Sequence, residues 1–207
     1  MTATAVRTRK PRATFHPLTV AAVDPVTDDA VAVTFAIPPE LRDAYGFAAG
    51  QHLTVRRVVD GVDIRRSYSI CSTPSLLLGA GLIRIGVREI VDGAFSRYAT
   101  RELRPGDVVE VFPPLGHFTT DLAPDRTRHY AAIVAGSGIT PVLSLVASAL
   151  ETEPASRFTV VYGNRRAATV MFADELADLK DRYPQRDRKS TRLNSSHQSV
   201  SRMPSSA

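Results

Sequence analysis

Short apolar-rich runs, separated by turn residues, occupy the chain from residue 18 to residue 112. Their length and spacing are typical of the strands of an antiparallel barrel. Six strands are predicted, over residues 18–23, 30–37, 52–59, 64–71, 82–90 and 107–112. Asp60-Gly61 predicts a hairpin between the third and fourth strands, and residues 92–103 predict a short helix with glycine and serine near its start.

The pattern changes after residue 128. A fully apolar run over residues 129–135 predicts a buried strand, and the turn "GSGITP" leads from it into a helix over residues 142–151. A second strand is predicted over residues 157–164 and a second helix over 171–183, where Phe172, Leu176, Leu179 and Tyr183 recur at helical spacing. Alternating strands and helices predict a parallel sheet with crossover connections. The fold class is therefore an antiparallel six-stranded barrel followed by an incomplete doubly wound domain.

The regular pattern ends near Asp187. Residues 188–207 are rich in serine and arginine and show no periodicity. A doubly wound sheet of two strands leaves an edge bare and buries little apolar surface. We therefore expect the native sequence to end near residue 187, followed by a disordered, non-native tail. A natural disordered tail is the alternative.

The net charge of +5 suggests nucleic-acid binding until the charges are located. Residues 1–12 carry +4 and residues 188–207 carry another +4, which leaves −3 for residues 13–187. Charged tails of this kind are usually solvated, so we expect no nucleic-acid partner. The basic N-terminal arm lacks the apolar segment of a secretory signal, and no run is long enough to predict a membrane span.

The single cysteine, Cys71, excludes an intrachain disulfide and a four-cysteine iron–sulfur site within these 207 residues. A reducing cytoplasm is the expected setting, and Cys71 itself is interpreted as a small buried strand residue. The five histidines have no metal-ligand spacing, so no metal site is predicted.

The turn after the first apolar strand of the second half could bind a phosphate. Gly136 and Gly138 would let the backbone approach an anion closely, and the helix N-terminus near Thr140 and Pro141 would attract it. A plain strand-to-helix turn is the alternative, because the pattern G-x-G-x-x-P departs from the usual fingerprint.

The end of the second strand in this half bears on which dinucleotide binds. Asn164, Arg165 and Arg166 stand where NAD-specific domains carry an acid. Arginine suits the 2′-phosphate of NADP, although two ordinary surface arginines would look the same.

The stretch "RRSYSICSTP" places an arginine, a tyrosine and a serine close together at the end of a strand. A bound flavin needs a counter-charge for its pyrophosphate, an aromatic surface against its ring and hydrogen bonds at the ring edge. Arg66, Tyr68 and Ser69 can supply these in that order. A second anion site is expected where the helix begins, at Gly93, Ala94, Phe95 and Ser96.

The motifs R-x-Y-S, "DGAFS", "AGSGITP" and "YGNR" resemble the ferredoxin–NADP reductase superfamily over about residues 14–186. The phrases "RRSYSIC", "AGSGITPVL" and "DLKDRYPQR" more specifically resemble the reductase subunits of phenylacetyl-CoA epoxidase systems in bacterial phenylacetate catabolism. The resemblance implies that Arg66 holds the phosphate of FAD, that Tyr68 packs on the isoalloxazine and that Ser69 bonds near its reactive edge.

The resemblance also implies a division of the chain and a direction of electron flow. We expect a disordered basic arm (residues 1–12), an FAD-binding barrel (13–120), a linker (121–128), the first half of an NADP-binding domain (129–187) and the tail (188–207). The family passes a hydride from NADPH to FAD, and electrons onward to a 2Fe-2S cluster and an oxygenase. The cluster domain is expected in full-length members and not within these residues. The alternative function is a non-catalytic flavin-binding module or electron-transfer partner in a multi-subunit complex.

Overall fold

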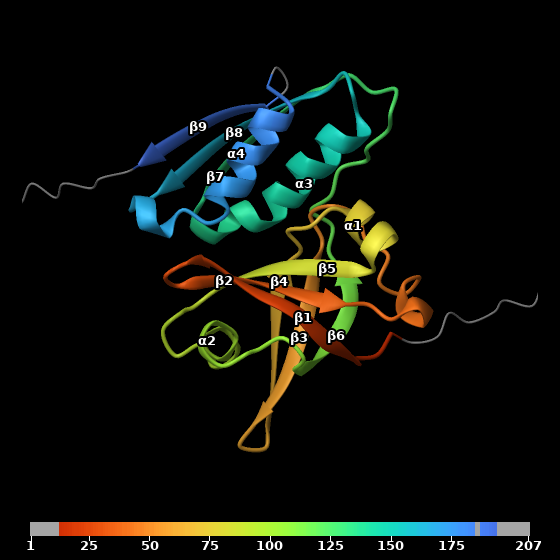
Figure 1. The fold of residues 1–207 in the computed structure, drawn as a ribbon, viewed down its shortest axis with the longest axis vertical. Coiled ribbons are helices and arrows are strands. Elements are labelled where there is room, and N and C mark those ends of the chain that lie inside the picture. Colours follow the sequence, from red (N-terminus) through yellow and green to blue (C-terminus); the bar gives the residue numbers. More distant parts are fainter. Residues whose placement is uncertain (1–12, 185–186, 194–207) are drawn as a thin grey trace, which may run out of the picture.

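The computed structural model describes residues 13–184 and the backbone of residues 187–193. Its first part is the predicted antiparallel barrel (Figure 1). The strands are β1 (His16–Thr27), β2 (Ala30–Ala36), β3 (His52–Val59), β4 (Val62–Ser69), β5 (Leu82–Arg88) and β6 (Val108–Leu115). All six predicted strands are present, so the fold class of this part is confirmed.

The sheet follows the order β4-β3-β6-β1-β2-β5, with antiparallel pairs throughout. Just past the end of β4, Ile70 forms an isolated antiparallel bridge with Ile85 of β5. The Cys71 N–H also donates to the Arg84 carbonyl at 2.8 Å. These few bonds join the two ends of the sheet, so that β4 and β5 meet at one point and separate beyond it.

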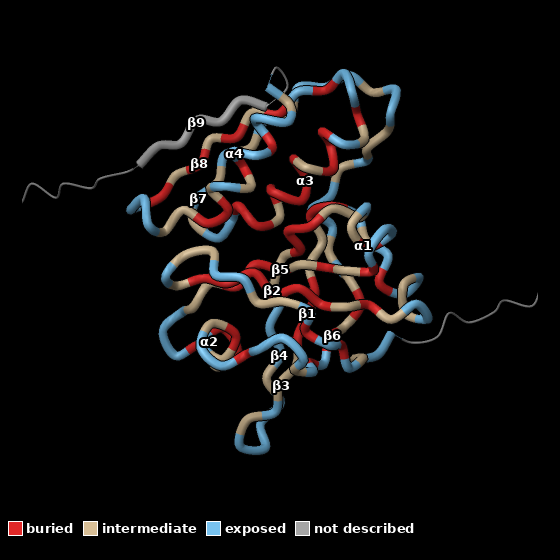
Figure 2. Tube along the Cα trace, in the orientation of Figure 1, coloured by how far each residue is buried: buried red, intermediate tan, exposed pale blue. Residues whose placement is uncertain are grey.

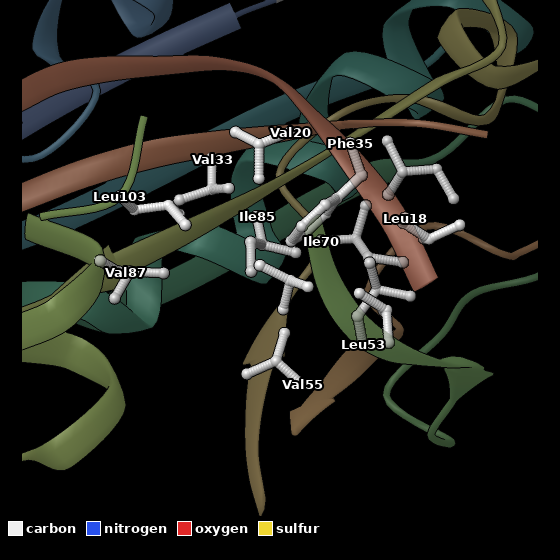
Figure 3. Packing of buried hydrophobic residues seen from close by; sticks show 14 of the residues in the cluster. Leu18, Val20, Val33, Phe35, Leu53, Val55, Ile70, Ile85, Val87 and Leu103 are labelled. Atoms are coloured by element: carbon white, nitrogen blue, oxygen red, sulfur yellow. The ribbon is translucent and has the colours of Figure 1, made fainter. Parts of the chain in front are cut away.

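The barrel is filled by aliphatic and aromatic side chains from every strand. Figure 3 shows the central ones turned toward one another: Leu18, Val20, Val33, Phe35, Leu53, Val55, Ile70, Ile85, Val87 and Leu103. Inward-facing residues alternate with outward-facing ones along strands such as β6, as expected for a sheet with one buried face. Burial of this apolar surface is the main stabilising term of the domain.

Two α-helices and one short 3-10 helix cover the barrel ends. α2 (Ala94–Arg101) is the helix predicted over residues 92–103. α1 (Pro74–Ala80) is not among the helices that the sequence predicts. Proline is tolerated in the first turn of a helix, and Gly81 ends α1 in the left-handed conformation with φ of 70°. The 3-10 helix η1 covers Pro39–Leu41.

The second part is a parallel sheet covered on one face by helices (Figure 1). Its elements are β7 (His129–Ala135), η2 (Gly136–Gly138), α3 (Ile139–Thr152), β8 (Arg157–Asn164), η3 (Ala167–Thr169) and α4 (Ala173–Arg182). β7 and β8 are parallel and in register from His129–Arg157 to Ala135–Gly163. The predicted strand–helix–strand–helix order is confirmed.

A third strand, β9 (Asp187–Leu193), continues the sheet beyond β8. The expectation that order ends near residue 187 is wrong for these seven residues. Their polar sequence carries no apolar periodicity, but the free edge of β8 offers backbone donors and acceptors that a parallel strand can satisfy whatever its side chains are. Residues 1–12 and 194–207, on which the predictions of a disordered arm and tail also fall, lie outside the described residues.

β7 is half-buried on one face only, in contrast to the fully buried strand that its sequence predicts. Its even-numbered residues are partly buried and pack against the cluster that contains α3, whereas the odd-numbered ones are exposed. In Figure 2, the buried segments of this part of the chain include stretches of α3 and β8. Ile133, one of the odd-numbered residues, is 86% exposed. An apolar sequence therefore overestimates burial here, because α3 and α4 both lie on the other face.

The two parts share a core. Ala30, Ala32 and Cys71 of the barrel belong to the same buried cluster as the inner faces of α3, α4 and β8. The Ser144 hydroxyl of α3 donates to the Ser72 carbonyl at 2.7 Å, and this bond is buried. Arg84 of β5 pairs with Glu175 of α4 at 3.1 Å. Among the described residues, no helix is long and apolar enough to cross a membrane.

The buried Ser144–Ser72 bond gives a test of this packing. We expect Ser144→Ala to lower the free energy of unfolding by about 1–3 kcal/mol, because the Ser72 carbonyl loses its donor in a buried position. Ser148→Ala, one turn further along α3, is the matched control. Its hydroxyl is also buried but has no hydrogen-bond partner among the described residues, so its removal should be neutral or slightly stabilising. Urea unfolding of both variants measures the difference, and equal effects would contradict the assignment.

Candidate functional site

A cleft of about 330 Å³ opens where β4 and β5 separate beyond the Ile70–Ile85 bridge. Because β4 pairs only with β3 along its length, its other edge borders the cleft. The lining residues are Arg66, Ser67, Tyr68, Ser69, Gly86, Arg88, Ile90, Ser96, Ser137 and Thr140. The structure thus brings together four residues predicted to bind flavin, Arg66, Tyr68, Ser69 and Ser96, and adds residues from β5 and the second domain.

Tyr68 forms the aromatic wall of this cleft. Its ring lies half-buried against Phe95 of α2, with ring centroids 5.5 Å apart. Burial raises the pKa of the Tyr68 hydroxyl to about 12, with the Arg66 charge lowering it by a smaller amount. The phenol is therefore neutral at physiological pH and presents an uncharged ring face.

Arg66 is exposed, and its guanidinium is free to meet an anion. One terminal nitrogen of Arg66 donates to the Arg65 carbonyl at 2.8 Å. Among the described residues, Arg66 makes no salt bridge with an acid. The neighbouring Arg65 points to the other face of β4, where Asp63 pairs with it at 2.7 Å. The alternation of the strand thus leaves one arginine of the pair at the cleft without a counter-ion.

The predicted anion site at residues 93–96 lies at the start of α2, with Gly93 as the N-cap. The first N–H groups of a helix have no intrahelical acceptor. A Cβ at Gly93 would lie 2.2 Å from the Ser96 hydroxyl, so the tight turn requires glycine. Ser96 alone of the four borders the cleft, because Ala94 lies outside it and the Phe95 side chain is buried in the barrel core.

A second cleft of about 630 Å³ lies at the C-terminal ends of β7 and β8. Its lining residues are Asp29, Arg88, Ala135, Gly136, Ser137, Gly163, Asn164, Arg165, Arg166 and Thr169. Four residues predicted for the dinucleotide, Gly136, Asn164, Arg165 and Arg166, are therefore brought together. Gly138 and Pro141 do not line this cleft, and Thr140 lines the first cleft instead.

The glycine turn has the conformation that an anion site at a helix N-terminus needs. Gly136 has φ of +51°, and the turn continues through η2 directly into α3. The carbonyl of Gly136 accepts a hydrogen bond from the Tyr162 hydroxyl at 2.9 Å, which fixes the turn against β8. Asn164 is buried at the end of β8, and its side-chain amide has no hydrogen-bond partner within normal geometry among the described residues.

Two residues join the clefts, since Arg88 and Ser137 line both. Neither Arg88 nor Asp29 was predicted from the sequence. Arg88 stands in an ordinary strand pattern, and Asp29 in a turn between β1 and β2, so no motif spacing marks them. The sequence does contain one hint of Arg88: a charged residue follows two positions after Gly86, on the strand that faces the second domain.

The single cysteine and the described acids and histidines form no further site. Cys71 is buried, as expected, and burial raises the pKa of its thiol to about 12, so it stays protonated. Among the residues the structure describes, no three His, Cys, Asp or Glu side chains are grouped as metal ligands would be.

Two family descriptions match the chain. "Oxidoreductase FAD-binding domain" matches residues 17–120, and "Oxidoreductase NAD-binding domain" matches residues 132–204. The chain belongs to the ferredoxin reductase family of FAD- and NAD-binding oxidoreductases. The resemblance inferred from R-x-Y-S and the glycine turn is thereby confirmed, and FAD and NAD(P)H are the cofactors that its two domains support.

Among curated proteins, the chain is similar to components of an epoxidase and of a monooxygenase. It is 51% identical over 173 residues to one subunit of the 1,2-phenylacetyl-CoA epoxidase of Escherichia coli, covering 84% of this chain and 48% of that protein. It is 38% identical to the ferredoxin reductase component of the 3-ketosteroid-9-alpha-monooxygenase of Rhodococcus rhodochrous, covering 82% of this chain and 46% of that protein. The chain thus spans about half the length of these relatives.

Solved structures support the fold. The ferredoxin–NADP⁺ reductase of Plasmodium falciparum with 2′P-AMP matches with a TM-score of 0.75 at 14% identity, covering 91% of this chain and 76% of that one. A cytochrome P450 reductase of Amycolatopsis matches with a TM-score of 0.69 at 26% identity, covering 88% and 53%.

The raised pKa of Tyr68 predicts a specific alkaline instability. The unfolded chain releases this proton near pH 10, whereas the folded chain keeps it to about pH 12. The contribution of the protonated Tyr68 hydroxyl to the free energy of unfolding is therefore fully present below pH 10 and is lost as the pH rises from about 10 to 12. The free energy of unfolding can be measured by chemical denaturation between pH 9 and pH 11.5, at intervals of roughly half a unit. It should fall less steeply with pH for Tyr68→Phe than for the unsubstituted chain. Parallel declines would contradict the assignment.

Proposed function

We propose that this chain binds FAD in the first cleft and NADPH in the second, and that a hydride passes from NADPH to FAD where the clefts meet. The observation that carries the proposal is the contact between the two clefts at Arg88 and Ser137. A hydride moves only over a very short distance, so its donor and acceptor must occupy adjoining sites. The redox chemistry itself is supplied by the flavin and the nicotinamide when they are bound.

The residues of the first cleft fit a flavin. Tyr68 offers a neutral aromatic face, and Arg66 offers a cation without a counter-ion. The start of α2 adds backbone N–H groups for phosphate. Ser69, at the end of β4, is proposed to bond near the ring edge. Ile90 and Tyr68 supply apolar surface that would exclude water from the ring.

The residues of the second cleft fit an anionic dinucleotide. The turn at Gly136 and the start of α3 would provide an anion site, and the Asn164 amide, buried in the lining, carries both donors and acceptors. Arg165 and Arg166 are exposed at the end of β8, where guanidinium groups favour a 2′-phosphate. This supports NADPH over NADH. Arg88 adds a positive charge at the junction, facing both cofactors.

The 51% identity to the E. coli protein supports a role in a multicomponent oxygenase system. On this proposal, electrons leave the flavin for an iron–sulfur centre and then a phenylacetyl-CoA epoxidase, in the cytoplasm. A non-catalytic flavin-binding module is the second candidate, favoured by the first cleft, whose lining by Arg66, Tyr68 and Ser69 fits a flavin without any contribution from a nicotinamide.

The flavin spectrum of the purified chain separates these candidates. We expect a visible flavin absorption band that bleaches when NADPH is added without oxygen, and that bleaches more slowly with NADH. Replacing both Arg165 and Arg166 by alanine should remove the preference for NADPH while leaving the band intact. A band that persists with both nucleotides would contradict hydride transfer and favour the binding module.

Arg66→Ala should weaken FAD binding by about tenfold to a hundredfold, because a hydrogen bond to a charged group contributes about 1.5–3 kcal/mol. Titration of FAD by fluorescence measures the dissociation constant. Arg65→Ala is the matched control: it removes the same charge from the adjacent position, where the guanidinium pairs with Asp63 on the other face. An unchanged affinity for Arg66→Ala, or equal losses for both variants, would overturn the assigned role.

A further inference from the structure

An ion pair lies at the junction of the two clefts. Arg88 of β5 places its Nε 3.4 Å from the Asp29 carboxylate, which belongs to the turn between β1 and β2. Among the described residues lining the second cleft, Asp29 is the only acid, and it shares the lining with Arg88, Arg165 and Arg166. A carboxylate is unexpected in a cleft otherwise suited to an anion, since it repels the ligand that the arginines attract.

The Arg88 side chain is held from three sides. It is only 19% exposed, and one terminal nitrogen donates to the Thr169 carbonyl of η3. The other terminal nitrogen lies 3.3 Å from the position that a Cβ at Gly136 would occupy. The Nε faces Asp29 without hydrogen-bond geometry. One terminal nitrogen therefore lies at the glycine turn and the other is held by η3, while the carboxylate acts on Arg88 mainly through its charge.

We propose that Asp29 is an electrostatic brake on dinucleotide binding, which offsets the charge of Arg88 and so speeds release of the oxidised dinucleotide. The inference rests on the proposed function, because it assigns a regulatory residue to the same cleft. Product release limits turnover in many enzymes. A cleft with three arginines and a helix N-terminus would hold a polyanion long after its hydride has been transferred.

The geometry allows the charge of Asp29 to be removed without removing its structural contacts. Its Oδ1 accepts a hydrogen bond from the Thr27 hydroxyl at 2.6 Å, and its backbone carbonyl accepts one from Glu89 at 2.7 Å. An asparagine keeps both acceptors. Arg88 also keeps its bond to Thr169. In Asp29→Asn only the negative charge disappears, so a change in affinity reports that charge.

The test is the dissociation constant of NADP⁺, measured by calorimetry on the whole FAD-loaded chain. We expect Asp29→Asn to bind NADP⁺ about two- to fivefold more tightly, the range expected for a partly exposed ion pair, and to release it correspondingly more slowly in stopped-flow displacement. The gain should shrink as salt is raised. Asp29→Ser should show the same tightening through a different side chain, and Asp29→Glu should restore the original affinity.

Asp28→Asn is the matched control. Asp28 is the exposed neighbour in the same turn and does not line the cleft, so the affinity of this variant should stay unchanged although the net charge shifts equally. In an Arg88→Gln background, the effect of Asp29→Asn should be largely lost, which a double-mutant cycle measures.

The outcomes separate the two proposals. If the unsubstituted chain binds no NADP⁺, the proposed function fails. If it binds but Asp29→Asn binds equally or more weakly, or if Asp28→Asn tightens binding as much, the brake is overturned while the proposed function stands. A structural loss at Asp29 would weaken binding, so tightening cannot arise from damage to the turn.

Discussion

The absence of a side chain at Gly86 determines how the two domains meet. A Cβ at this position of β5 would lie 2.9 Å from both branches of the Thr140 side chain and 3.0 Å from the Phe172 ring. Those distances are shorter than ordinary van der Waals contacts, so only glycine lets α3 and the start of α4 rest on the backbone of β5. Phe172 is itself held in the left-handed region, with φ of 58°, while its ring is buried. A bulky residue persists in that conformation only where packing requires it.

The position of both clefts follows from this contact. Because Thr140 reaches β5, the glycine turn before α3 is brought beside Arg88, two residues after Gly86. The barrel contributes the other requirement, since β4 and β5 are joined only near Ile70 and Ile85 and leave an opening for a planar group. Domain docking thus places the first cleft next to the glycine turn, an arrangement that neither domain forms alone. The Ser144–Ser72 bond and the Arg84–Glu175 pair hold this arrangement from the far side.

Most of the fold could be predicted from local patterns. The six barrel strands, α2, α3, β8 and α4 all follow from apolar periodicity and turn residues, which act over a few neighbouring positions. α1 was missed because proline and serine favour a turn as readily as a first helical turn. β9 was missed because it is stabilised by the edge of β8 rather than by its own apolar residues. The burial of β7 was overestimated because sequence does not show that both helices cover the same face.

The residues of the candidate site divide in the same way. Arg66, Tyr68 and Ser69 could be proposed from their order along a single strand, and Gly136 from the turn before a helix. Arg88 and Asp29 could not, since they come from separate strands and meet the second domain only in space. The sequence by itself therefore determined most of the elements, the family and the chemistry available in each half of the chain, because these depend on residue type and short-range spacing. Only the tertiary structure decided that the two clefts share a wall, that Arg88 lines both and that an acid stands beside it, because those relations depend on packing across Gly86 between segments far apart in the chain.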